Sequence, residues 1–135
     1  MKITIETTVR SDIAKVWSAW TTPADINRWN AASDDWHTPR ATNDLRVGGS
    51  LSFRMEARDK SAGFDFGGTY TLVSPRERLH FILADGRHVD VRFLPEGNKV
   101  RVVEEFETET TNSAELQRKG WQAILDNFKR HVEES

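Results

Sequence analysis

The chain has 135 residues, of which 37% are hydrophobic and 30% are charged, and its formal net charge is −2. Because charges of both signs are interspersed, the chain offers no basic surface for nucleic acid or for an anionic membrane. The absence of cysteine excludes disulfides, a thiolate nucleophile and cysteine-ligated zinc.

A strand and two short helices are the first predicted elements. Residues 3–9 alternate between apolar and polar side chains, which is the period of a half-buried strand. Ser11 is a suitable N-cap for a helix whose apolar residues recur on one face as far as Trp20. Thr22 followed by Pro23 then marks the start of a second helix, which ends near Trp29.

The middle of the chain predicts strands almost throughout. Residues 30–44 lack periodicity and predict a loop broken by a short strand near Trp36. Alternation of apolar and polar side chains then predicts strands over residues 51–58, 64–72, 79–83, 89–93 and 100–106. Asp85-Gly86 is a hairpin signal, so these strands are antiparallel. The parity of the last strand also directs Glu104 to its apolar face.

Residues 113–133 predict one long amphipathic helix. Its apolar side chains recur at three- and four-residue steps: Leu116, Trp121, Ile124, Leu125, Phe128 and Val132. Gly120 lies inside it at a cost of about 1 kcal/mol relative to Ala, which indicates a close backbone approach or a space kept beside Trp121. The element order predicts one α+β domain over residues 1–135, in which the long helix lies across a curved antiparallel sheet of about six strands.

Four motifs along the chain occur in a distinctive order. They are VWSAWTTP at residues 16–23, DLRVGG at 44–49, GTY leading to RLHF over 68–81, and GWQAILDNF at 120–128. Together they resemble the START-like (SRPBCC) superfamily, and within it the activator of heat-shock protein 90 ATPase homologue group. The resemblance implies a helix-grip fold, whose sheet wraps around the closing helix and leaves a cavity between them. In many relatives this cavity holds an apolar or amphipathic small molecule, while others stimulate the chaperone ATPase or catalyse cyclisation or dehydration.

The first functional hypothesis is non-catalytic binding of a hydrophobic small molecule in this cavity. The predicted lining residues are Trp29, Phe53, Met55, Tyr70, Phe81, Trp121, Ile124 and Leu125, with His37 or Glu104 supplying a polar contact. Plain core packing is the alternative for each apolar member, since a buried side chain of this kind contributes on the order of 1.5–3 kcal/mol.

Two other functions stay open at this point. An enzyme of the cyclase or hydratase kind would use Glu104 and His37 as acid and base, and a chaperone ATPase co-regulator would use a protein surface. His37 belongs to the cluster 33–37, whose Ser and Asp residues are also ordinary turn formers. A buried Glu104 needs a partner, for which Arg54 or Arg46 is the candidate, unless a bulge turns it to solvent.

No metal or cofactor is expected. The histidines are scattered along the chain, and none has a second ligand at a recognised zinc spacing: His37, His80, His88 and His131. Four arginines are predicted to lie on the solvated face of the sheet: Arg78, Arg87, Arg92 and Arg101.

Neither a membrane-spanning helix nor a signal peptide is predicted from the sequence. No run approaches the ~20 apolar residues of a membrane helix. Residues 1–10 lack the apolar centre of a signal peptide. A cytoplasmic protein is therefore expected, with a small-molecule ligand and, as the resemblance implies, a chaperone among its partners.

Overall fold

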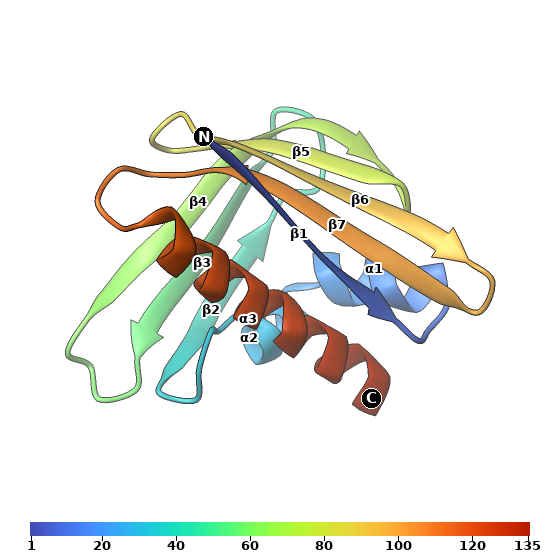
Figure 1. Ribbon diagram of the computed structural model, residues 1–135, viewed down its shortest axis with the longest axis horizontal. Helices are drawn as coiled ribbons and strands as arrows, with labels where there is room; N and C mark the ends of the chain where they lie inside the picture. The colour runs from blue at the N-terminus through green and yellow to red at the C-terminus, as the bar shows by residue number, and fades with distance from the viewer.

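Seven antiparallel strands form one curved sheet in the computed structural model of this protein, which describes residues 1–135 (Figure 1). The strands are β1 Lys2–Val9, β2 Trp36–Asn43, β3 Ser50–Ala57, β4 Gly63–Ser74, β5 Arg78–Leu83, β6 His88–Glu96 and β7 Lys99–Glu107. Their order is β1-β7-β6-β5-β4-β3-β2, so the first strand pairs with the last and all others pair with chain neighbours. β1 and β2 are therefore the edge strands.

Three helices complete the fold. They are α1 Ile13–Thr21, α2 Pro23–Trp29 and α3 Ala114–Glu134. In Figure 1, α3 lies diagonally across the concave side of the sheet, and α1 and α2 lie beside its C-terminal half. The α+β helix-grip fold is thus confirmed. None of the helices combines the length and the apolar composition needed to cross a membrane.

The C-terminal half of α3 is anchored in the hydrophobic core. Phe128 is fully buried, and its ring meets the rings of Trp20 and Trp29 edge-on at centroid distances of 4.9 and 5.0 Å. Leu125 and Val132 flank it on the same helical face and are also buried. Full burial of such a side chain stabilises the fold by roughly 1.5–3 kcal/mol, so this half of α3 is structural.

Polar side chains of α3 also cover the open edge of β1. They donate hydrogen bonds to backbone carbonyl oxygens of the strand, in the pairs Arg118 to Thr4, Gln122 to Glu6 and Lys129 to Thr8. An edge strand otherwise presents unpaired backbone groups to other chains. The closing helix therefore protects this edge as well as the face of the sheet.

β2 is longer than the short strand near Trp36 that the sequence predicted. Residues 36–43 form a full strand although they include Pro39, because β2 lies at an edge, where a missing N–H removes no bond on the open side. A register shift between His37 and Arg40 accommodates this stretch.

Two predicted details at the helix ends are wrong. Asp12, rather than Ser11, caps α1, and its carboxylate accepts a hydrogen bond from the backbone N–H of Lys15 at 2.8 Å. Leu116 is 57% exposed and lies outside the core-facing stripe of α3, whereas Gln117 is buried. Gln117 takes this place because its amide bonds the backbone of the loop 108–113, which packs against the helix start.

Candidate functional site

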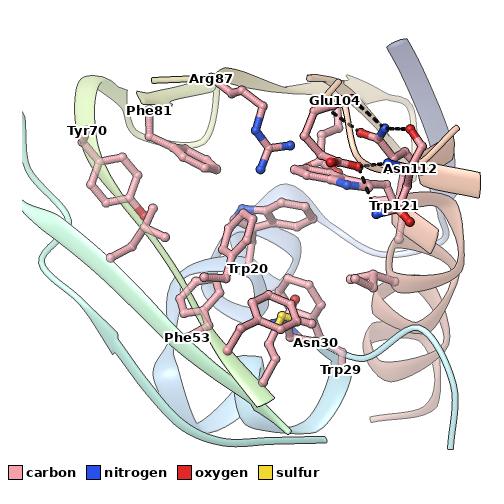
Figure 2. Close-up of a pocket in the computed structure, with 18 residues that line it drawn as sticks. Trp20, Trp29, Asn30, Phe53, Tyr70, Phe81, Arg87, Glu104, Asn112 and Trp121 are labelled. Atoms are coloured by element: carbon pink, nitrogen blue, oxygen red, sulfur yellow. Dashed lines mark hydrogen bonds between the residues drawn. The ribbon is translucent and has the colours of Figure 1, made fainter. Parts of the chain in front are cut away.

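A cavity of ≈ 380 Å³ lies between the N-terminal half of α3, helices α1 and α2, and the concave face of the sheet (Figure 2). Eighteen residues line it, and twelve of them are hydrophobic. Small-molecule sites in proteins have volumes in this range and combine apolar walls with a few polar groups. The exposed Phe64 and Asn112 belong to the lining, so the cavity reaches the surface.

Trp121 forms the wall of the cavity on the side of α3. Its indole stacks on the ring of Phe106 at a centroid distance of 4.0 Å and an interplanar angle of 7°. Phe66 meets the same indole edge-on at 5.9 Å. These contacts hold the indole in one orientation, with Phe106 behind it in the core.

The opposite wall consists of aromatic side chains from β3, β4 and β5. Phe53 stacks on Phe66 at 6.0 Å, and Tyr70 meets Phe81 edge-on at 5.8 Å. The hydroxyl of Tyr70 donates a hydrogen bond to the amide oxygen of Asn43 at 2.6 Å, and burial raises its pKa to about 12. Tyr70 therefore contributes a neutral ring, and its proton is already engaged.

Glu104 on β7 adds a carboxyl group to the lining without a protein partner. The residue is 7% exposed, and it lies between Ile5 of β1 and Val91 of β6 in the sheet. No hydrogen bond or ion pair satisfies its side chain, and burial raises its pKa to about 8. The inward orientation that strand parity predicted is confirmed, and the carboxyl is mostly protonated at neutral pH.

Arg87 precedes β6 and extends its guanidinium into the same cavity, as Figure 2 shows. Its Nε donates to the carboxylate of Asp85 at 2.8 Å, and its Nη1 lies 3.5 Å from the carbonyl oxygen of Glu107. Its Nη2 makes no hydrogen bond within the protein. Arg87 thus carries a permanent positive charge with an unused donor at the cavity.

The remaining polar groups of the loop beside α3 bond one another. The Glu109 carboxylate accepts hydrogen bonds from the backbone of Thr111 and Asn112. Burial works to raise the pKa of Glu109, but these bonds outweigh it and hold the pKa below its usual value. Gln117 bonds Glu109 and Asn112 with both ends of its amide. These groups fix the cavity rim rather than offering free donors.

A family model described as "Activator of Hsp90 ATPase homolog 1-like protein" matches residues 10–133, from the residue after β1 to the last turn of α3. The chain belongs to this family. The START-like assignment made from the motifs is therefore confirmed, and the family has a fold of the ligand-binding and co-chaperone type. No curated protein sequence matches the chain.

Solved structures of similar proteins share the architecture. The solution structure of an AHSA1-like protein from Aeromonas hydrophila is 51% identical, with a TM-score of 0.93 over 99% of this chain and 93% of that one. A protein from Cytophaga hutchinsonii is 46% identical, with a TM-score of 0.85 over 98% and 92% of the two chains. Protein CV1439 from Chromobacterium violaceum is 20% identical, with a TM-score of 0.87 over 98% of each chain, which shows the fold alone.

Within this family fold, the predicted site residues come together at the cavity with one exception. The lining includes Trp29, Phe53, Met55, Tyr70, Phe81, Glu104, Trp121, Ile124 and Leu125. His37 does not line it. His37 pairs with Glu56 across β2 and β3, and paired residues share a face of the sheet. Because Glu56 alternates with the cavity-facing Met55, His37 points to the other face, where it lies 3.9 Å from the Glu56 carboxylate.

Arg87 is the lining residue that the sequence interpretation placed wrongly. Arg87 shares the parity of Val89 and Val91, whose side chains face the core, whereas Arg92 has the opposite parity. The alternation of β6, continued one residue before its first residue, is the signal that identifies Arg87 as a lining residue. The lining also includes Trp20, Phe66 and two residues of the loop 108–113, Glu109 and Asn112, and this loop carried no sequence pattern.

Arg78, Arg92 and Arg101 alternate with buried residues along their strands and lie on the outer face of the sheet, as predicted. Arg78 and Arg92 both bind Asp90, with Nε to carboxylate distances of 2.8 and 3.1 Å. The predicted partners of Glu104 are wrong, because Arg54 pairs with Glu56 at 2.9 Å and Arg46 with Asp44 at 3.0 Å.

The histidines are less scattered than the sequence indicated. His80 and His88 lie 2.9 Å apart between ring nitrogens across the β5–β6 hairpin. No group of three or more metal-ligating side chains is assembled.

Gly120 lies in α3 beside the cavity wall, and replacing it by alanine is expected to raise the free energy of unfolding by about 0.5–1 kcal/mol. A Cβ atom at this position would meet no heavy atom within 4 Å, so the alternative of a close backbone approach is wrong. Urea denaturation of Gly120→Ala checks the value, with Ala123→Gly on the same helix as the control of opposite sign. A loss of stability in Gly120→Ala would contradict this.

Proposed function

We propose that this chain, as one helix-grip domain, binds an apolar or amphipathic small molecule in the cavity between α3 and the sheet, without catalysing a reaction. The observation that carries the proposal is the cavity itself, which is mainly hydrophobic and holds a buried carboxyl group with no partner in the protein. Proteins seldom leave a polar group buried without a partner, because its lost hydration is then uncompensated. A bound molecule would supply that partner.

The volume indicates the size of the molecule. A cavity of ≈ 380 Å³ holds roughly a dozen non-hydrogen atoms, if each takes ~30 Å³ as a water molecule does in the liquid. This favours a medium-length alkyl chain or a one- to two-ring aromatic compound with one polar group.

The position of His37 supports binding over catalysis. The cyclase or hydratase alternative required Glu104 and His37 to face one cavity as acid and base. His37 instead lies on the face of β2 and β3 that carries Glu56, away from the cavity. Proton transfer needs direct or one-water contact, so this pair does not serve as a catalytic dyad.

Native mass spectrometry of the purified chain, followed by titration with alkyl and aromatic amphiphiles, tests the binding. We expect a bound mass or a saturable change in tryptophan emission, because Trp20, Trp29 and Trp121 all line the cavity. Ile124→Phe adds a ring inside the cavity and is expected to weaken binding roughly tenfold or more.

Leu116→Phe is the matched control, since it adds a similar ring to the exposed side of α3. Its affinity is expected to stay within about twofold of the unmodified protein, a change that corresponds to less than about 0.5 kcal/mol. Equal weakening by both variants, or the absence of any bound mass and any emission change, would contradict the proposal.

Co-regulation of a chaperone is the second candidate, and the family description, which names the Hsp90 ATPase, is the observation that favours it. The purified chain added to an Hsp90-type chaperone would then raise its ATP turnover. The effect would persist in Ile124→Phe if it uses a surface rather than the cavity.

A further inference from the structure

Two ionisable groups in the cavity lining have polar atoms with no partner in the protein. The amide of Gln117 and the carboxylate of Glu109 are satisfied by the loop 108–113, and the Tyr70 hydroxyl donates its hydrogen bond to the amide oxygen of Asn43. Arg87 keeps its Nη2 free, and Glu104 has no partner on either oxygen. The ion pair of Arg87 is with the exposed Asp85, at 2.8 Å, and no ion pair joins Arg87 to Glu104.

The two groups also lie at the same end of the cavity. Arg87 reaches the carbonyl oxygen of Glu107, three residues beyond Glu104 on the same strand. Figure 2 shows both on the side opposite Phe53 and Trp29. The cavity therefore carries these two ionisable groups on one side and faces them with apolar walls, which fits a molecule with one polar head and one apolar tail.

We propose that the ligand is an amphipathic carboxylic acid, bound with its carboxylate at Arg87 and Glu104 and with its apolar tail among Phe53, Met55 and Trp29. This inference deepens the proposed binding function and rests on it. The new element is the charge of the ligand's head group, which the family fold does not specify.

Arg87 decides in favour of an anionic head. Its Nε already pairs with the Asp85 carboxylate, but its Nη2 offers a charged N–H donor to the cavity, which a carboxylate accepts and a cationic head does not. A carboxylate accepts its N–H groups in a charge-assisted hydrogen bond, which is among the stronger polar contacts in proteins. Apolar walls lower the local dielectric constant, so this attraction is stronger in the cavity than in bulk solvent.

Glu104 complements this role as a neutral donor. Burial raises its pKa to about 8, so at neutral pH its O–H is available to the ligand carboxylate. The other charged or titratable groups of the lining are Arg87, Glu109 and Tyr70. The pKa of Glu109 is lowered and that of Tyr70 is raised to about 12, so Glu104 is the member of this set that titrates between about pH 6 and pH 9.

Decanoate, 1-decanol and decylamine test the head group, because they share one alkyl chain and differ in charge. Decanoate has twelve non-hydrogen atoms, which matches the roughly dozen that the cavity holds. By calorimetric titration at about pH 6, we expect decanoate to bind most tightly and decylamine most weakly. Arg87→Gln should weaken decanoate binding roughly ten- to a hundredfold, as for a lost charge-assisted hydrogen bond, and change decanol binding less than about threefold.

Arg92→Gln is the matched control, because Arg92 lies on the outer face and pairs with Asp90. It removes the same charge and is expected to leave decanoate affinity within about twofold. A charge effect that acts over the whole protein surface would weaken binding in both variants.

The pH dependence isolates Glu104. Between about pH 6 and pH 9, decanoate affinity of the unmodified protein should fall about tenfold, since ionised Glu104 repels the ligand. In Glu104→Gln, whose amide still donates, the affinity should change less than about twofold. Thermal melts of each variant confirm that it is folded.

The outcomes separate this inference from the function on which it rests. If decanol or decylamine binds at least as tightly as decanoate, or if Arg87→Gln leaves decanoate affinity unchanged, the carboxylic acid assignment is overturned and cavity binding stands. If none of the three binds, and native mass spectrometry finds no bound mass, the proposed function fails and this inference fails with it.

Discussion

Replacing Glu104 by glutamine is expected to stabilise the protein at alkaline pH and to leave its stability almost unchanged near pH 5. The pKa of Glu104 is about 8 in the folded protein, against 4.5 as its ordinary value. The folded state therefore binds more protons than the unfolded state between these two values. Under this linkage the free energy of unfolding falls as pH rises through that window, and the loss is complete above about pH 8.

The size of the effect follows from the shift in pKa. At about 1.4 kcal/mol per pKa unit, the shift sets an upper bound of about 5 kcal/mol. The free-energy difference between Glu104→Gln and the unmodified protein should therefore grow by roughly 2–5 kcal/mol from about pH 5 to about pH 9. Urea denaturation at a series of pH values measures this difference directly.

Asp90→Asn is the control, because Asp90 is a buried carboxylate with partners. Burial acts to raise its pKa, but hydrogen bonds from Arg78 and Arg92 outweigh this effect and lower it. Its removal should therefore destabilise the protein at neutral pH, opposite in sign to Glu104→Gln. A pH-independent difference between Glu104→Gln and the unmodified protein would show that Glu104 is ionised and solvated.

Phe128→Ala is expected to lower the free energy of unfolding by about 3–5 kcal/mol. The ring of Phe128 is fully buried and packs edge-on against both Trp20 and Trp29, so its loss leaves a void that rigid indoles do not close. Chemical denaturation at about pH 7 measures the loss.

Trp121→Ala on the same helix provides the comparison. Trp121 is only partly buried, and one side of its ring faces the cavity, so the free energy of unfolding should fall less than in Phe128→Ala. Ligand affinity should nevertheless fall, since a wall of the site is removed. If Trp121→Ala were the more destabilising variant, the N-terminal half of α3 would be core rather than cavity wall.

The features that depend on local periodicity were predictable from the sequence. The apolar stripe of α3 and the strand alternation are properties of neighbouring residues, and they indicated both the fold and the inward orientation of Glu104. Parity also marked Arg87, since it continues the row of Val89 and Val91. It was grouped with Arg78, Arg92 and Arg101, which alternate with apolar neighbours, and so was assigned to the solvated face.

The features that depend on non-local packing were not predictable. The orientation of His37 follows from its pairing with Glu56, and this register is set by β3 rather than by the residues around His37. The burial of Gln117 depends on its bonds to a loop with no periodic pattern. A cavity and a filled core have the same sequence pattern, because the difference lies in how far the helix stands from the sheet.

The hydrogen bonds between α3 and the edge of β1 have a consequence for folding during synthesis. β1 emerges from the ribosome first, but it pairs with β7, whose partner residues are about a hundred positions later in the chain. α3 follows only after every strand has been made. Until it docks, the concave face of the sheet and the β1 edge both stay open to water and to other nascent chains. Variants that weaken α3 docking should therefore lower the yield of folded protein more than its equilibrium stability would indicate.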